Sequence, residues 1–208
     1  MYKSCLKRTV DIALSAIGLV LLALPMLAVA AVVKLDSKGP VFFWQKRVGL
    51  HKNTFMMPKF RTMYTDTPAN MPTHMLNDPQ KWITCSGEWL RKFSLDELPQ
   101  ILNILAGQMS IIGPRPALWN QYDLIAERDK YGANDIRPGL TGWAQINGRD
   151  ELPIEIKAAY DGEYVKRMSF LFDCKCFFGT IACVLKKEGV VEGGTGTLQK
   201  LADEGRKQ

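Results

Sequence analysis

The sequence predicts an α+β fold with a membrane anchor: an N-terminal re-entrant membrane helix hairpin, a small β-hairpin or sheet, and several helices, some amphipathic at the membrane interface. Three observations predict it. Residues 12–33 carry no charge, residues 41–63 are rich in β-formers, and much of the remainder has helical patterning. We therefore expect an anchor at 1–38, a larger domain at 39–188 and a Gly-rich tail at 189–208.

The apolar run is long enough to cross a hydrocarbon core of about 30 Å. A signal peptide is disfavoured because the run is long and no small-residue cleavage site follows it. Pro25 interrupts the run, and basic residues flank both of its ends: Lys3, Lys7 and Arg8 before it, Lys34 and Lys38 after it. A single span predicts asymmetric flanks, whereas a hairpin that breaks at Pro25 explains both features. Span and hairpin both stay open from the residues alone.

Charge is concentrated around this run. Residues 1–70 hold ten Lys and Arg against three Asp and Glu, which suits anionic lipid headgroups. No aromatic-and-basic repeat accompanies the charge, so we expect no nucleic-acid partner. Asp11 is expected to pair with Lys7 or Arg8 on the same helical turn, either as a structural contact or to orient a lipid phosphate.

The residues after the apolar run predict strands first and helices later. Two strands within 41–63 flank a turn at Gly49–Asn53, and the Pro-rich stretch 65–80 is loop-like. Helices fit 87–92, 95–106, 117–131, 151–168 and 170–187. The last is either a core helix or an amphipathic helix on a membrane.

Ser94-Leu95-Asp96-Glu97 is the most informative motif, and it has two interpretations. Ser-x-x-Glu before an apolar run is a capping box, with Ser94 as N-cap. Alternatively, two adjacent carboxylates at a helix start, near basic Arg91, could hold Mg²⁺ and attack phosphorus.

Two further motifs carry positive charge. Prolines flank Arg115 in Gly113-Pro114-Arg115-Pro116, so its guanidinium is either held stiffly for bidentate phosphate binding or solvated in a plain loop. The stretch 135–149 combines Arg137 and Arg149 with glycines that permit close backbone approach. Lys59 and Arg61, two apart on a strand, are expected to share a side and extend this basic site.

The sequence shows no disulfide framework and no common nucleotide-binding loop. The five cysteines have no framework spacing, which indicates a reducing compartment, and Cys174-x-Cys176 has neither histidine near it in sequence. The chain has no Walker-type or GxGxxG loop.

Four motifs in order, from Lys59-Phe60-Arg61-Thr62-Met63 through 94–100 and 113–116 to 137–145, closely resemble the bacterial sugar transferase family, the small monotopic phosphoglycosyl transferases. The likeness runs from about Leu6 to Lys187. It implies a re-entrant helix broken near Pro25, a catalytic domain on the cytoplasmic face of the bacterial inner membrane, and Mg²⁺ as cofactor. It further implies transfer of a sugar-1-phosphate from a UDP-sugar to undecaprenyl phosphate, as the first membrane step of surface glycan synthesis; a homodimer is left open.

The resemblance also assigns roles. Asp96 would be nucleophile and Mg²⁺ ligand, forming a phosphosugar-aspartate ester, and Glu97 the assisting base. Expected substrate contacts are Lys59, Arg61, Arg91, Arg115, Arg137, Gln145 and Arg149; expected lipid-phosphate or membrane residues are Lys7, Arg8, Asp11 and Pro25. Asp161 and Asp173 match acidic family positions whose role we do not derive. Thr84-Cys85-Ser86-Gly87 lacks an arginine that relatives often have, which puts one substrate contact in doubt.

Two other functions fit the residues without the resemblance. A non-catalytic membrane scaffold would use the same anchor and basic surface but would not depend on Asp96 or Mg²⁺. A phospholipid-modifying transferase would also use carboxylates and Mg²⁺, and would release CMP instead of UMP.

Overall fold

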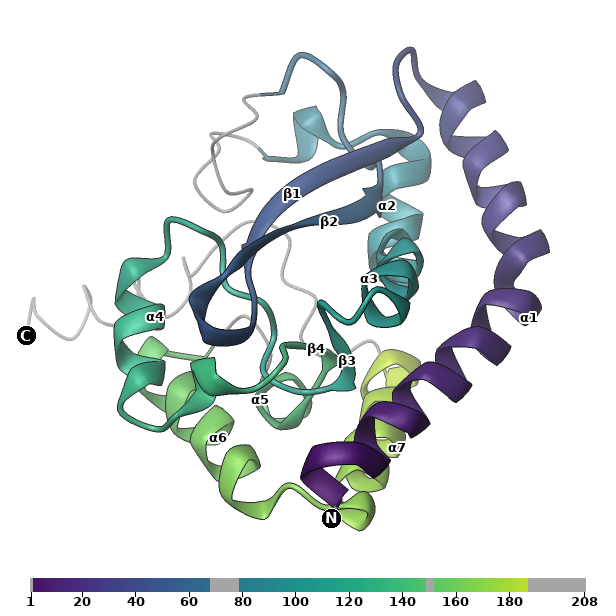
Figure 1. Cartoon of the computed structure of the whole chain (residues 1–208). Coiled ribbons are helices and arrows are strands. Elements are labelled where there is room, and N and C mark those ends of the chain that lie inside the picture. The colour runs from purple at the N-terminus through teal and green to yellow at the C-terminus, as the bar shows by residue number, and fades with distance from the viewer. Residues whose placement is uncertain (1, 68–78, 149–151, 187–208) are drawn as a thin grey trace, which may run out of the picture.

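The computed structural model describes residues 2–67, 79–148 and 152–186. Figure 1 shows a mixed arrangement in which helices surround two small sheets and one long helix follows the outside of the molecule. The expected α+β class is therefore confirmed. Arg149, the tail at 189–208 and most of the loop at 65–80 lie outside the described residues.

The long N-terminal helix, α1 (Lys7–Asp36), follows a short π-helical segment, η1 (Tyr2–Leu6). The expected break at Pro25 is absent, because the helix continues through it and curves along the outside of the molecule instead of folding into two antiparallel helices (Figure 1). Pro25 is exposed, where the lost backbone hydrogen bond is tolerated as a bend. Among the described residues, α1 is long and apolar enough to cross a membrane.

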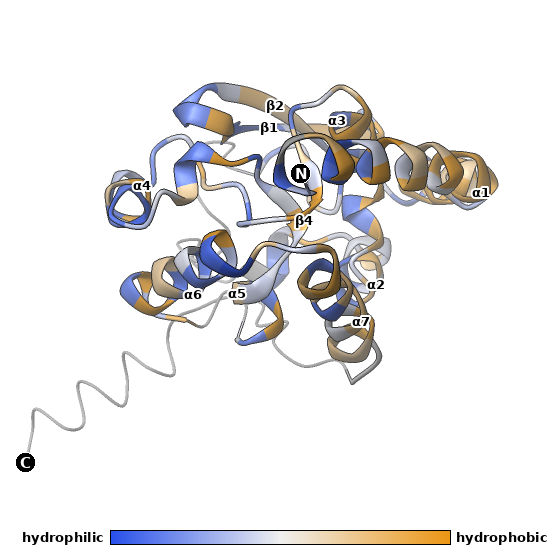
Figure 2. Cartoon of the chain, turned by 60° about the horizontal axis from the view of Figure 1, so that its bottom comes forward, coloured by the Kyte–Doolittle hydropathy of each residue, from blue (hydrophilic) through white to orange (hydrophobic). Residues whose placement is uncertain are grey.

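One face of α1 packs on the protein and the other does not. Val29 and Val33 are buried against Phe60 and Leu90, whereas the side chains of Val20 and Leu24 are 77% and 78% exposed. Figure 2 shows this helix projecting from the rest of the chain and coloured apolar along most of its length. An apolar face without a protein partner on so long a helix is typical of lipid contact.

The first sheet is the expected hairpin. β1 (Phe42–Val48) pairs with β2 (Thr54–Phe60) in antiparallel register, from Phe42 opposite Phe60 to Val48 opposite Thr54. The turn between them holds η2 (Leu50–Lys52), in which His51 has a φ of 52°.

The second sheet was not predicted. β3 (Ser110–Ile112) pairs with β4 (Gly139–Thr141) in parallel. The two backbones approach so closely that a Cβ on Gly139 would lie 2.1 Å from the backbone nitrogen of Gly113. The glycines of this stretch thus permit close backbone approach as expected, and what approaches is the other strand.

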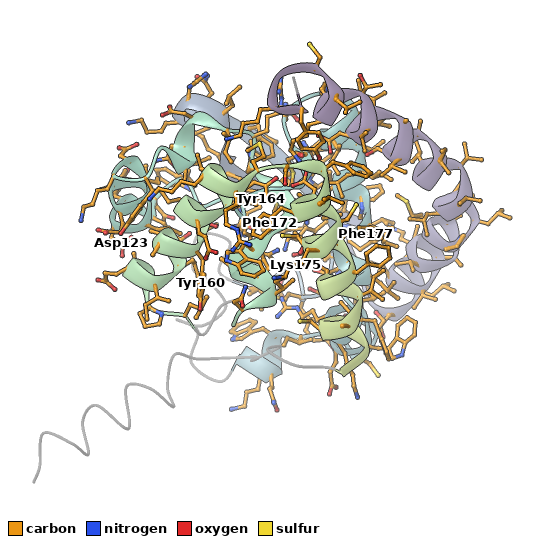
Figure 3. The ribbon with its side chains drawn as sticks, turned by 90° about the horizontal axis from the view of Figure 1, so that it is seen from below. Asp123, Tyr160, Tyr164, Phe172, Lys175 and Phe177 are labelled. Atoms are coloured by element: carbon orange, nitrogen blue, oxygen red, sulfur yellow. The ribbon has the colours of Figure 1, made fainter. Side chains whose placement is uncertain are left out.

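Two of the expected helices are much shorter than the sequence indicates. The expected 95–106 helix is a 3₁₀ segment, η5 (Leu95–Gln100), followed by α3 (Ile101–Leu105), and the 117–131 helix is α4 (Tyr122–Asp129) only. The remaining helical elements are η4 (Pro79–Trp82), α2 (Cys85–Lys92), η6 (Ala133–Asp135), α5 (Trp143–Ile146), α6 (Ile154–Arg167) and α7 (Phe170–Lys186). Tyr164 of α6 and Phe172 of α7 lie side by side in the core, as Figure 3 shows, in a cluster that includes Ile112 of β3.

Candidate active site

Asp96 and Glu97 lie in η5, which packs against strand β2. The capping-box interpretation is wrong. Ser94 has a left-handed backbone with φ of 55° and makes no side-chain cap, and the Glu97 carboxylate does not reach back to the Ser94 backbone. Pro99 within this segment lacks an N–H, which favours the short 3₁₀ segment over a regular α-helix.

Glu97 is held by two cations from other parts of the chain. Arg115 grips it with both terminal nitrogens, at 2.6 and 3.1 Å, and the Lys59 ammonium donates to it at 2.7 Å. Burial alone would raise the pKa of Glu97, but the charges of Arg115 and Lys59 outweigh it and hold that pKa well below its usual range. The Arg115 guanidinium, which the sequence suggested for phosphate binding, therefore binds a carboxylate in this structure, because a buried anion requires nearby positive charge.

Asp96, beside it, is in a different state. Its side chain is buried, and burial raises its pKa to about 6, against the opposing charge of Lys59. Glu97 raises the pKa further, while Arg91 and Arg115 lower it. At neutral pH roughly nine-tenths of such a group is ionised, and it is a stronger base than an ordinary aspartate. The pair thus holds one carboxylate whose pKa is lowered by nearby cations and one whose pKa is raised by burial. We call Lys59, Arg91, Asp96, Glu97 and Arg115 the carboxylate site.

Three elements position this site. β2 carries Lys59, α2 carries Arg91, whose Nε donates to the Thr62 hydroxyl at 2.9 Å, and the segment after β3 carries Arg115. Thr84 caps α2 by accepting a hydrogen bond from the Gly87 amide at 3.0 Å, so the Thr-x-x-Gly match has a structural role here.

Arg61 is not part of the carboxylate site. Strand β2 ends at Phe60, so the alternation that would place Lys59 and Arg61 on one side does not continue. Arg61 is buried and donates to the Ser37 hydroxyl, the Ser37 carbonyl and the Pro40 carbonyl. These bonds hold the connection between α1 and β1, and a substrate contact for Arg61 stays a prediction.

Arg137 and Gln145 also lie in other contacts. Arg137 is exposed and donates to the Gly107 carbonyl at 2.9 Å, close to Arg8. Gln145 is buried, and neither atom of its amide has a hydrogen-bond partner. A substrate contact for these two residues stays a prediction.

The residues expected at the lipid phosphate dock α1 onto the rest of the chain. Lys7 forms an ion pair with Asp173 at 2.6 Å, Arg8 donates to the carbonyls of Ile104 and Leu105, and Asp11 accepts from the Ile111 amide at 3.1 Å. The expected pairing of Asp11 with its own helical turn is not what the structure shows.

Asp173 is the centre of a buried polar joint between α1, α6 and α7. It accepts from the Tyr2 hydroxyl at 2.5 Å, from Lys7, and from the Tyr164 hydroxyl at 2.7 Å. Asp161, in turn, pairs with Arg128 of α4. The sequence offered no signal for Tyr2, Tyr164 or Arg128, because each partner is more than 30 positions away or comes from an unrelated element.

A Mg²⁺ ion would require carboxylate oxygens that are not already occupied by other contacts. Among the described residues no group of three His, Cys, Asp or Glu side chains could hold a metal ion, and both Glu97 oxygens already accept from Arg115. This leaves the Asp96 carboxylate. A single carboxylate fits Mg²⁺, which is usually bound by one or two carboxylates together with substrate phosphates.

Comparison with known proteins points to one family. A family model described as bacterial sugar transferase matches residues 2–187. The chain is 38% identical to an uncharacterized sugar transferase, EpsL, of Bacillus subtilis, over 96% of this chain and 97% of that protein. It is 40% identical to a UDP-glucose:undecaprenyl-phosphate glucose-1-phosphate transferase of Escherichia coli, over 85% of this chain and 39% of the relative. An undecaprenyl-phosphate glucose phosphotransferase of Komagataeibacter xylinus is 38% identical over 84% of this chain and 35% of its own length.

Proposed function

The chain belongs to the bacterial sugar transferase family, and from this premise we propose that it moves a sugar-1-phosphate from a UDP-sugar to undecaprenyl phosphate. The supporting relatives include two whose names state this type of reaction, although the chain spans less than half of their length. A surface glycan pathway is supported by relatives named as exopolysaccharide production proteins in two rhizobia.

The observation that carries the mechanism is the contrast between Asp96 and Glu97. Asp96 attacks the β-phosphorus of the UDP-sugar, the bond to UMP breaks, and a phosphosugar-aspartate ester forms. An oxygen of undecaprenyl phosphate then attacks the same phosphorus and restores the carboxylate. A carboxylate with a pKa of about 6 is ionised at neutral pH and is a better nucleophile than an ordinary aspartate.

We infer that Glu97 has a different role from the base that the resemblance implies. A carboxylate whose pKa is held well below the usual range is a poor proton acceptor. Its contacts instead bring Arg115 and Lys59 beside Asp96, where their charges face the phosphates. Mg²⁺, held by Asp96 and the diphosphate, would offset negative charge on the phosphates.

The site is proposed to work at the cytoplasmic face of the inner membrane. The exposed apolar face of α1 and the exposed side chains of Phe170, Leu171 and Phe178 on α7 support lipid contact for both helices. Labelling of native Cys5 and of Lys38→Cys, each as the sole cysteine, tests whether both ends of α1 react from the cytoplasmic side. Reaction of one end only from the periplasm would show a span.

The decisive experiment is mass spectrometry of enzyme quenched after incubation with a panel of UDP-sugars and Mg²⁺ without lipid acceptor. We expect a phosphosugar adduct on the peptide that contains Asp96, together with UMP release. Asp96→Asn should show neither, and Glu88→Gln, which changes an exposed carboxylate eight positions earlier, should show both. An adduct that persists in Asp96→Asn, or CMP release from a CDP-linked substrate alone, would refute the proposal.

A further inference from the structure

An ion pair outside the carboxylate site is buried more deeply than any of the site's own charges. Arg128 of α4 and Asp161 of α6 meet at 2.6 Å, and their side chains are only 4% and 1% exposed. A second contact, from Nε of Arg128, measures 2.8 Å. The chain just after α4 comes close to α6 because Gly162 lies against Tyr131, where a Cβ would be 2.6 Å from the tyrosine side chain. The fold therefore brings these two charges together in its interior.

A buried ion pair is weak evidence of a stabilising role. Removing two charges from water costs about as much as their attraction returns, so hydrophobic side chains of similar volume often do as well. Here the balance is poorer still, because Oδ1 of Asp161 is buried without a hydrogen-bond partner. Burial also raises the pKa of Asp161 despite the adjacent arginine. A costly arrangement of this kind indicates a role other than holding the fold together.

The third contact of Arg128 indicates what that role is. Its Nη1 donates to the backbone carbonyl of Arg115 at 2.9 Å, and the Arg115 side chain grips Glu97. Asp161 thus orients Arg128, Arg128 holds the backbone of Arg115, and Arg115 reaches the carboxylate site.

The backbone around Arg115 requires such support. Pro114 and Pro116 have no N–H groups, so this segment is held chiefly through its carbonyls. The Pro114 carbonyl accepts from the Gly139 amide at 2.8 Å, and the Pro116 carbonyl accepts from Arg47 at 2.8 Å. Arg128 binds the carbonyl between them, which is that of Arg115 itself, the residue whose side chain must be oriented.

We propose that Arg128 and Asp161 are positioning residues for the transfer reaction, which fix the backbone of Arg115 so that its guanidinium meets Glu97 and the substrate phosphates in one orientation. The part of this inference that concerns substrate rests on the proposed function; the part that concerns Arg115 and Glu97 does not. Groups held on packed, hydrogen-bonded backbone keep the geometry that catalysis requires, and a displacement of about 1 Å can cost roughly a hundredfold in rate.

The test removes both charges at once, in Arg128→Met/Asp161→Leu, so that no buried ion is left unpaired. We expect a melting temperature near that of the wild type, a kcat lower by about 10- to 100-fold and a KM for the UDP-sugar within a few-fold. The matched control makes the same replacements at the exposed pair Lys52 and Asp129, as Lys52→Met/Asp129→Leu, and should leave kcat unchanged. Because the effect is transmitted through Arg115, it should largely disappear in an Arg115→Ala background.

A second readout does not depend on turnover. The nitrogen-15 signal of the Arg115 guanidinium, assigned by its loss in Arg115→Lys and recorded in lipid nanodiscs, should shift or broaden in the double variant and not in the control. A folded double variant with wild-type kcat and an unchanged Arg115 signal would overturn the inference. If the signal changes while the wild type releases no UMP from any UDP-sugar, the positioning role stands and the proposed function fails.

A third variant covers the case in which the double variant does not fold. Arg128→Lys keeps the charge beside Asp161 but replaces the planar fork by one ammonium group, which cannot bind the carboxylate and the Arg115 carbonyl in the same geometry. A lower kcat in folded Arg128→Lys supports the positioning role, and wild-type kcat would refute it.

Discussion

The carboxylate site and the polar joint around Asp173 are both built from buried acids and cations, and they differ in how the cations are distributed. At the joint, one carboxylate accepts from Tyr2, Lys7 and Tyr164. At the carboxylate site, Arg115 and Lys59 bind Glu97, and burial is the dominant influence on the neighbouring Asp96. Burial of an acid is therefore common to both regions, and it does not by itself mark a catalytic group. The residue that we propose as nucleophile, Asp96, is the one whose pKa burial raises despite the charges of Lys59, Arg91 and Arg115.

The largest effect should come from Asp96→Asn, which we expect to lower turnover more than about 10³-fold while making the protein more stable. The folded-state pKa of about 6 lies above that of the unfolded chain, so ionising Asp96 at pH 7 costs the folded state free energy that an amide avoids. The gain should be about 1–3 kcal/mol. UMP release and thermal melting in the same detergent measure both changes. Retained turnover would contradict a catalytic role for Asp96, and a lower melting temperature would contradict its raised pKa.

The opposite pattern is expected at the joint. Asp173→Asn leaves Lys7 buried without its counter-charge, which should cost about 3–5 kcal/mol of stability. Turnover per folded molecule should change little. Asp129→Asn, at an exposed pair with Lys52, is the control and should cost less than about 1 kcal/mol. If Asp173→Asn melts like the wild type, the joint is not what attaches α1.

A smaller loss is expected from Arg115→Lys, because an ammonium group keeps the charge but cannot bind Glu97 with two parallel hydrogen bonds. The activation free energy of turnover should rise by about 1–3 kcal/mol, which is the range of hydrogen bonds to charged groups. Arg167→Lys, at an exposed pair with Glu163, should leave turnover unchanged. Steady-state kinetics of the two variants provide the comparison, and equal rates would assign Arg115 to structure alone.

The mildest test changes only pH. The Asp96 anion is lost as pH falls through its raised pKa of about 6, whereas Glu97 stays ionised because its pKa is held well below the usual range. Turnover should therefore fall about tenfold per unit below pH 6. A pH–rate profile measures this fall. A rate that stays level down to pH 5 would show that Asp96 titrates like an ordinary exposed aspartate.

Local features of the fold could be predicted well. The apolar run predicts α1, alternation predicts the β1–β2 hairpin, and apolar periodicity predicts α2, α6 and α7 within a few residues. The parallel β3–β4 pair was missed because each strand has only three residues and its partner lies almost 30 positions away. Pro25 predicted a break that did not form, because an exposed proline bends a helix without ending it.

The candidate site divides in the same way. Asp96, Glu97, Lys59, Arg91 and Arg115 were identified from residue type and motif, and the structure brings them together. Lys59 and Arg61 were expected to extend one basic site, but β2 ends at Phe60, and Arg61 bonds Ser37 whereas Lys59 bonds Glu97.

The sequence by itself determined the chemistry present: an apolar helix, an adjacent pair of carboxylates, and a set of basic residues in motifs with stiff or open backbone. Only the tertiary structure decided which cation meets which anion. It directed Arg115 and Lys59 to Glu97, Lys7 to Asp173 and Arg128 to Asp161. The reason is physical. A carboxylate's pKa and reactivity depend on burial and on charges within a few ångströms, and in a folded chain those charges come from residues far away in sequence.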